Sequence, residues 1–176
     1  MDITDLILDQ HQQQRRLFGL LQQMHDAKPD ELSAVWGALK ALLDVHAEAE
    51  ERFFYPRLLK EGSGEADADS AKEETKDAIE DHNEIRDAGE AVDKEKPGSD
   101  SWFKAVTKAD EANSKHMGEE ERQGLADFRE HASVDERHRL GIQFIAFTSE
   151  HREGIKAVDK DPDAYVKAPE KELAKG

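Results

Sequence analysis

The chain contains no cysteine among its 176 residues. This absence excludes disulfide bonds, thiolate nucleophiles, iron–sulfur clusters and thiolate-bound zinc together. Aromatic residues are also few, at 6%, and the hydrophobic fraction of 36% lies slightly below the charged fraction of 38%. Such a mixture is typical of amphipathic helices whose outer faces are heavily solvated.

Basic residues are scarce: 25 Lys and Arg stand against 41 Asp and Glu, which gives a formal net charge of −16. An acidic excess of this size repels phosphate backbones and anionic lipid. Because no dense basic patch offsets it, we expect no nucleic-acid partner and no membrane partner. Long apolar runs are missing, and the first five residues (MDITD) lack the pattern of an export signal. A cytoplasmic location is therefore expected.

Strand patterns are missing as well: no segment alternates apolar and polar residues, and none has hairpin turn chemistry. Apolar residues recur at intervals of three and four instead, which predicts helices. Proline and glycine separate these helices, and Pro56 should end or kink the second one. The expected helices cover about residues 3–25, 30–56, 70–95, 100–128 and 134–155.

The predicted fold is all-α: an up-and-down four-helix bundle with an additional C-terminal helix. We expect residues 1–130 to form the bundle domain. Residues 131–158 form an amphipathic helix that packs on the bundle or lies at a homodimer interface, because its apolar face is too rich to be left in water. Residues 159–176 are charged and are expected to be a mobile tail.

His46 and Glu50 are four residues apart on the apolar stripe of the second predicted helix, so they share one face. Two polar groups on a core-facing stripe need a partner, and a metal ion is the strongest one available. Taken alone, a buried histidine is more often satisfied by a backbone carbonyl. The prediction of a metal site depends on four such histidines occurring together, one on the apolar stripe of each bundle helix. The candidate ligands are His11, His46, Glu50, His82, His116, Glu120 and Glu121.

The ligand types narrow the choice of metal. Imidazoles disfavour Mg and Ca, and the lack of thiolate disfavours Cu(I), so Fe, Mn or Zn remain. Glutamates that can bridge suggest two ions. A ferritin-type site would need Glu three residues before a histidine. No histidine of this chain has Glu at that position, so the ferritin-type interpretation fails. The remaining histidines do not lie at the height along the bundle that the four candidate ligands share. They are interpreted as surface or packing residues: His25, His131, His138 and His151.

The reversed order, with histidine first, resembles the haemerythrin-like proteins, which carry an HHE cation-binding domain. The similarity rests on DQHQQQRRLF around His11, HAEAEERFFYP from His46, EDHNEIR around His82 and HMGEEER from His116, and it covers about residues 3–128. The resemblance implies a four-helix bundle around two non-haem iron ions, oxo- or hydroxo-bridged when ferric. It also implies that carboxylates bridge the irons, with Glu50 in that role on the second helix and Glu120 or Glu121 on the fourth.

One position departs from the family. Oxygen-carrying members have a second histidine four residues after the first on the third helix, where this chain has Arg86. Arginine is permanently protonated and cannot ligate iron. One iron then either keeps an open site or takes a substitute ligand. Tyr55 is a candidate substitute, although a core tyrosine is the preferred interpretation, and Arg86 could pair with a bridging carboxylate or with bound peroxide.

A di-iron centre can bind O2 reversibly, reduce it, or disproportionate peroxide. Because the fifth histidine is missing, the first hypothesis is reaction with hydrogen peroxide or O2, catalase-like in outcome and serving oxidative-stress defence. The alternative is a binding module without catalysis: O2 carriage, iron storage or donation, or sensing of iron or oxygen. A third possibility is a metal-free bundle with accidental histidines.

Overall fold

The computed structural model describes residues 1–63 and 70–173, and the described residues form helices and no strand. The all-α prediction is therefore confirmed. The helices in chain order are α1 (Ile3–Gln23), α2 (Pro29–Ala49), η1 (Glu50–Phe54), α3 (Tyr55–Glu61), α4 (Ala71–Asp93), α5 (Asp100–Arg122), α6 (Gly124–His131), α7 (Val134–Glu150), α8 (Pro162–Tyr165) and α9 (Glu170–Leu173). Gly64, one of the glycines between the second and third expected helices, lies outside the described residues.

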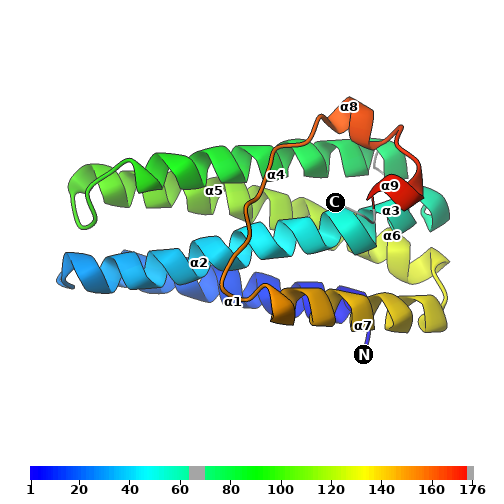
Figure 1. Cartoon of the computed structure of the whole chain (residues 1–176), viewed down its shortest axis with the longest axis horizontal. Helices are drawn as coiled ribbons and strands as arrows, with labels where there is room; N and C mark the ends of the chain where they lie inside the picture. Colours follow the sequence, from blue (N-terminus) through cyan, green and yellow to red (C-terminus); the bar gives the residue numbers. More distant parts are fainter. Residues whose placement is uncertain (64–69, 174–176) are drawn as a thin grey trace.

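Four long helices, α1, α2, α4 and α5, run along the long axis of the molecule, and each is antiparallel to the one before it (Figure 1). This is the predicted up-and-down bundle. Side chains start several of these helices: the Asp2 carboxylate accepts from the Thr4 backbone N–H at 3.0 Å, and the Ser99 hydroxyl accepts from Trp102. Pro29 opens α2 at a position where no backbone donor is needed.

Two apolar clusters fill the bundle, and a polar layer separates them. The first contains Ile7, Phe54 and Phe128, and the second contains Phe18, Trp36, Leu39 and other side chains towards the opposite end. His11 lies between Ile7 and Phe18 along α1, and it is fully buried. The candidate metal ligands therefore lie inside the protein, between two apolar cores that hold the helices at this level.

The second helix does not end at Pro56. It widens into the π-helical turn η1, in which the Tyr55 N–H donates to the Glu50 carbonyl five residues earlier, and then continues as α3. Proline has no N–H and its ring collides with the carbonyl four residues before it, so an undistorted α-helix cannot pass through this position. The π turn is the expected distortion, and such turns are frequent at functional sites.

The fourth predicted helix is broken, contrary to expectation. It ends at Arg122, and α6 starts at Gly124 after the non-helical backbone of Gln123 (φ −111°, ψ −84°). At Gly124 a side chain would lie 3.3 Å from Leu58, so the chain comes close to α3 here. The break lets α6 pack against α3 instead of continuing along the bundle axis.

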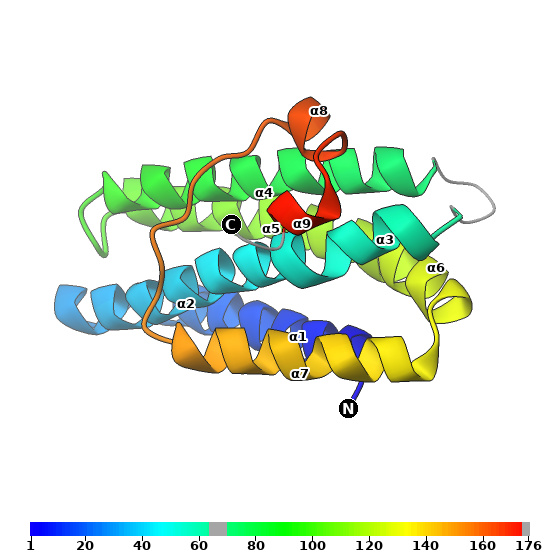
Figure 2. The same cartoon turned by 45° about the vertical axis from the view of Figure 1, so that its right-hand side comes forward.

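The C-terminal helix α7 packs on α1 and α2, and it buries Leu140 and Phe144 there (Figure 2). The bundle itself thus covers the central apolar residues of α7. A homodimer through α7 stays a prediction. Beyond α7 the chain crosses α2 to reach α4, where α8 packs (Figure 1). Residues 159–166, predicted to be a mobile tail, are packed in the structure, and Tyr165 is only 4% exposed. Among the described residues, no helix is long and apolar enough to cross a membrane.

Candidate metal centre

Each of the four bundle helices contributes one buried histidine to a single cluster: His11 from α1, His46 from α2, His82 from α4 and His116 from α5. The ligand atoms form two trios, His11–His46–Glu50 and Glu50–His82–His116, and within each trio all atoms lie within 4.8 Å of one another. Glu50 is shared by both. We call these residues and Glu120 the central cluster.

Glu50 lies between the two trios, and each of its oxygens faces a different one. Its Oε1 is 2.9 Å from His46 Nε2 and 4.0 Å from His11 Nε2. Its Oε2 is 3.3 Å from His82 Nε2, which in turn is 3.1 Å from His116 Nε2. A carboxylate placed in this way can bind one ion with each oxygen.

The fourth bundle helix offers two successive acids, and only Glu120 points inwards. Its Oε2 is 3.3 Å from His11 Nε2, and the residue is 6% exposed. Glu121 lies on the outer side of His11: its Oε1 is 2.9 Å from His11 Nδ1 and 2.8 Å from Arg15 Nη1. The structure therefore separates the two candidates. Glu121 contacts the outer nitrogen of a candidate ligand, whereas Glu120 faces the inner one.

The Nδ1 atoms of three cluster histidines lie within hydrogen-bond distance of an oxygen acceptor on the side away from the centre, and that of His116 faces a more distant one. The distances are 2.9 Å from His11 to Glu121, 2.8 Å from His46 to Gln10, 2.8 Å from His82 to Glu51, and 3.8 Å from His116 to Asp81. An acceptor at Nδ1 favours the tautomer with its proton there, which leaves the Nε2 lone pair free to bind. Metal-binding histidines are oriented by acceptors of this kind.

The inward-facing atoms test whether a metal fits. Within the described chain, His11 Nε2, His46 Nε2, Glu120 Oε2 and both Glu50 oxygens are buried without a hydrogen bond. Leaving polar atoms unpaired in an apolar interior costs free energy, and a bound cation would satisfy all of them together. The donor set of imidazole nitrogens and carboxylate oxygens suits iron, manganese or zinc.

The π turn η1 explains how one helix supplies so many polar groups. Glu50 and Glu51 are both 0% exposed, and the bond from the Tyr55 N–H to the Glu50 carbonyl brings Tyr55 one wide turn below Glu50. The Tyr55 hydroxyl donates to Glu120 Oε1 at 2.6 Å. Burial and the nearby Glu120 and Glu50 raise the pKa of Tyr55 well above its usual value, so the proton stays on the phenol. Tyr55 is thus a hydrogen-bond donor to Glu120.

Arg86 does not reach a carboxylate of the central cluster. Its Nη2 donates to Glu51 Oε1 at 2.5 Å, and its Nη1 donates to Asn83 Oδ1 at 3.0 Å. Glu51 is also the acceptor for His82 Nδ1. The expected pairing of Arg86 with a bridging carboxylate is therefore corrected: the arginine acts one step further out, through Glu51.

Charges in the metal-free cluster balance each other. Burial raises the pKa of Glu50, but His46 and His82 outweigh it and hold that pKa well below its usual range. Burial lowers the pKa values of His11 and His82, yet the neighbouring carboxylates outweigh it and raise both to about 9. Burial dominates at His46 and lowers its pKa. Protons on His11 and His82 thus occupy the place of a cation, and a metal would displace them.

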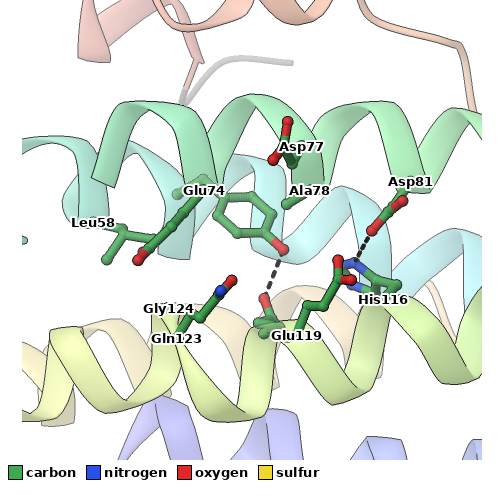
Figure 3. A pocket seen from close by; sticks show the side chains of 11 residues that line it. Leu58, Glu74, Asp77, Ala78, Asp81, His116, Glu119, Gln123 and Gly124 are labelled. Carbon is green, nitrogen blue, oxygen red and sulfur yellow. Dashed lines mark hydrogen bonds and ion pairs between the residues drawn. The ribbon is translucent and has the colours of Figure 1, made fainter. Parts of the chain in front are cut away.

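Two cavities approach the cluster from different sides. The first lies between α3, α4 and α5, and its lining includes the exposed Asp77, the half-buried Glu119 and the buried Glu74 and His116 (Figure 3). The second is small and largely apolar, and it lies against His46, His82 and His116, with Leu43, Ala47, Ile85 and Arg86 also in its wall. The cavity has room for about one water-sized molecule beside the His82–His116 pair.

Some functional residues were not predicted from the sequence. Three were missed because each is next to a more conspicuous candidate in the chain: Gln10 next to His11, Glu51 next to Glu50 and Asp81 next to His82. The rule that a metal-binding histidine needs an acceptor at Nδ1 could have prompted a search for them. The four histidines expected at the surface or in packing lie outside the cluster; His25, for example, packs on the ring of Phe103.

Comparisons with known proteins agree with this geometry. A sequence model of the Hemerythrin HHE cation binding domain matches residues 2–126, which contain the whole central cluster. A DNA nickase from Nostoc sp. is 27% identical over 149 residues, which make up 85% of this chain. The chain spans about 40% of the length of that protein. No solved structure matches it.

Proposed function

We propose that this chain, which belongs to the hemerythrin HHE cation-binding family, is a non-haem di-iron protein that reacts with hydrogen peroxide or O2. One observation carries the proposal: inward-facing ligand atoms from four helices converge on Glu50, and most of them are buried without a hydrogen bond. A bound cation would pair all of these atoms at once, which the protein does not do by itself.

The residues would divide between two ions. His11, His46 and Glu120 would hold one, His82 and His116 would hold the other, and Glu50 would contribute one oxygen to each. Two irons bound there would supply Lewis acidity and one-electron redox chemistry towards a small oxygen ligand. The outer acceptors keep each imidazole aimed inwards, and the Tyr55 hydroxyl holds its proton at Glu120.

Turnover is favoured over carriage by the surroundings of the His82–His116 pair. Arg86 is turned to Glu51, so the helix-three position that holds a fifth histidine in oxygen carriers supplies no ligand here. The small cavity lies against the same pair. This side of the centre thus combines fewer protein ligands with space for a small molecule, and those are the requirements for binding and converting peroxide.

The test is iron content together with peroxide consumption. Protein loaded with ferrous iron should contain about two irons per chain, as two trios sharing one carboxylate imply, and should convert hydrogen peroxide to water and O2. Glu50→Ala should lose both irons and this activity. Glu119→Ala, which removes a half-buried acid one position before Glu120, serves as the matched control and should keep both. Retention of iron and activity by Glu50→Ala would overturn the proposal.

The alternative is binding without catalysis, as in O2 carriage, iron storage or sensing. An absorption spectrum separates the two. A stable oxygenated band that forms in air and disappears under vacuum indicates carriage, whereas rapid oxidation with O2 release from peroxide indicates turnover. Oxidative-stress defence, a cytoplasmic location, a homodimer through α7 and a bundle domain bounded at residue 130 stay predictions.

The nickase from Nostoc sp. suggests a second candidate function, the cutting of one DNA strand. The formal charge of −16 opposes this function, because DNA binding needs cations that neutralise phosphates. Incubation of supercoiled plasmid with the iron-loaded protein decides the matter, and we expect the plasmid to stay supercoiled.

A further inference from the structure

The Glu51 carboxylate is fully buried, and three cationic or polar donors hold it. His82 Nδ1 lies 2.8 Å from Oε1, Arg86 Nη2 donates to the same oxygen at 2.5 Å, and Lys160 Nζ donates to Oε2. His82 and Arg86 lie within the segment that the family model matches, residues 2–126, whereas Lys160 lies beyond it. One donor to this carboxylate therefore comes from a part of the chain that the family domain does not include.

Lys160 belongs to residues 155–166, which we call the strap because they lead from α7 over α2 to α4 (Figure 1). The Lys160 backbone N–H donates to Asn83 Oδ1 at 3.1 Å, and its carbonyl accepts from Asn83 Nδ2 at 2.8 Å. The Tyr165 hydroxyl donates to the Glu51 backbone carbonyl at 2.5 Å. The strap is thus fixed to α4 through Asn83 and touches Glu51 at both its backbone and its carboxylate.

The lysine also resolves an electrostatic conflict. Glu48 and Glu51 lie on the same side of the helix, and Lys160 Nζ contacts both carboxylates, at 2.9 Å from Glu48 Oε2. Glu48 has Arg52 as a further partner, whereas Glu51 pairs with His82, Arg86 and Lys160. Removing one partner from a buried ion pair strongly destabilises the charge that is left. Without Lys160, the Glu51 carboxylate should turn away from His82.

We infer that Lys160 is a positioning residue for the His82–His116 side of the centre. It holds Glu51 in the place where that carboxylate accepts the His82 Nδ1 proton, which aims His82 Nε2 at Glu50 and His116. The inference rests on the proposed function, since it takes His82 to be a metal ligand. It extends that proposal by making the strap part of the site and by assigning its effect to one of two ions.

The test is a titration of metal-free protein with cobalt(II), followed by calorimetry and visible absorption. The native protein should bind two ions per chain. Lys160→Met should bind one ion as the native protein does and the other roughly 10- to 100-fold more weakly, the usual effect of removing a group that orients a ligand. Proton NMR of the cobalt protein should show one exchangeable histidine N–H that exchanges faster, because only His82 has lost its fixed acceptor.

Matched variants separate positioning from simple attachment of the tail. Lys76 also attaches the tail to α4, through an ion pair with Asp163 at 2.9 Å. Its side chain is 41% exposed, and its ion-pair partner is Asp163 and not Glu51. Lys76→Met should leave both ions tightly bound. Lys160→Arg should restore the second ion, since arginine can donate to both Glu48 and Glu51. Should Lys160→Met not fold, Lys160→Gln, which removes the charge with less change in shape, is read by the same titration.

The outcomes are distinguishable. Failure of the native protein to bind cobalt or iron would overturn both this inference and the proposed function. Two tight ions in the native protein and also in Lys160→Met would overturn the inference alone. Equal weakening of both ions in Lys160→Met, or the same loss in Lys76→Met, would show a general effect of the tail and would overturn it as well.

Discussion

The two sides of the candidate centre are built from the same residue types but differ in how completely the protein closes them. The His11–His46 side has a second carboxylate, Glu120, and the ring of Phe144 from α7 lies 6.3 Å from His46. The His82–His116 side has no second inward carboxylate among the described residues, and both of its histidines line the small cavity, whereas His46 alone does so from the first side. The first side is therefore suited to hold an ion, and the second to expose one.

The outer contacts differ in the same way. On the first side His11 and His46 are backed by Glu121 and Gln10, which lie within the bundle helices α5 and α1. On the second side His82 is backed by Glu51, whose position depends on Arg86 and on Lys160 of the strap. A centre with one self-contained side and one externally supported side can lose reactivity at the second without losing the ion at the first.

Removing one histidine from each side should give the largest difference in iron content and peroxide consumption. His82→Ala should retain one ion and lose peroxide consumption, because the ion beside the cavity is lost. His46→Ala should lose the ion on the closed side and, because His46 also holds Glu50 at 2.9 Å, should weaken the other. Iron content and peroxide consumption of both variants are the measurements. Equal iron and equal activity in the two variants would contradict the asymmetry.

Tyr55→Phe should produce a smaller effect, confined to the closed side. The variant leaves Glu120 Oε1 without its donor at 2.6 Å. Loss of a hydrogen bond to a buried charged group costs about 1.5–3 kcal/mol, so the metal-free protein should unfold at lower denaturant concentration. Tyr165→Phe, which removes a hydroxyl that donates to the neutral Glu51 carbonyl, is the matched comparison and should lower the stability less.

In the metal titration, Tyr55→Phe should weaken the ion bound by Glu120 and spare the one at His82–His116. Two ions bound with native affinity would show that the hydroxyl contributes to stability alone. Should the His82–His116 ion be the weaker one instead, Tyr55 would have to act through Glu50, and the assignment of Glu120 to the closed side would be wrong.

The helical bundle and most of the central cluster were predictable from the sequence because both depend on periodicity. A histidine at every bundle helix on an apolar stripe can be read from spacing alone, and the family match confirms the resemblance. The choice between Glu120 and Glu121 could not be read in this way. Adjacent residues differ by about 100° around an α-helix, and whether α5 turns one or the other inwards depends on its packing against α1.

The remaining differences have the same origin in tertiary contacts. Pro56 predicted a distortion, but not a π turn that buries Glu50, Glu51 and Tyr55 together. Residues 159–176, which include Lys160 and Tyr165 of the strap, were predicted to be mobile because they are charged. The packing of the strap depends on Lys160 and Tyr165, each of which finds a partner on η1 or α2 that is more than 100 positions away in the chain.

The pH dependence of stability needs no substitution, and it involves one histidine from each side. His11 and His82, one on each side, have pKa values raised to about 9 in the metal-free protein. A raised pKa contributes stability that is fully present below the unfolded value of 6.5 and is lost as the pH rises through about 9. The lowered pKa of Glu50 contributes stability above the unfolded value of 4.5, lost at acid pH. The melting temperature of metal-free protein should therefore be highest between pH 4.5 and pH 6.5, the two unfolded pKa values, and should fall by several degrees towards pH 9.

Metal-loaded protein should not show this fall, because its histidines carry no ring proton at Nε2. Scanning calorimetry of both forms from pH 5 to about 9.5 is the measurement. A parallel fall in both forms would mean that protons and metal do not compete for the same nitrogen atoms.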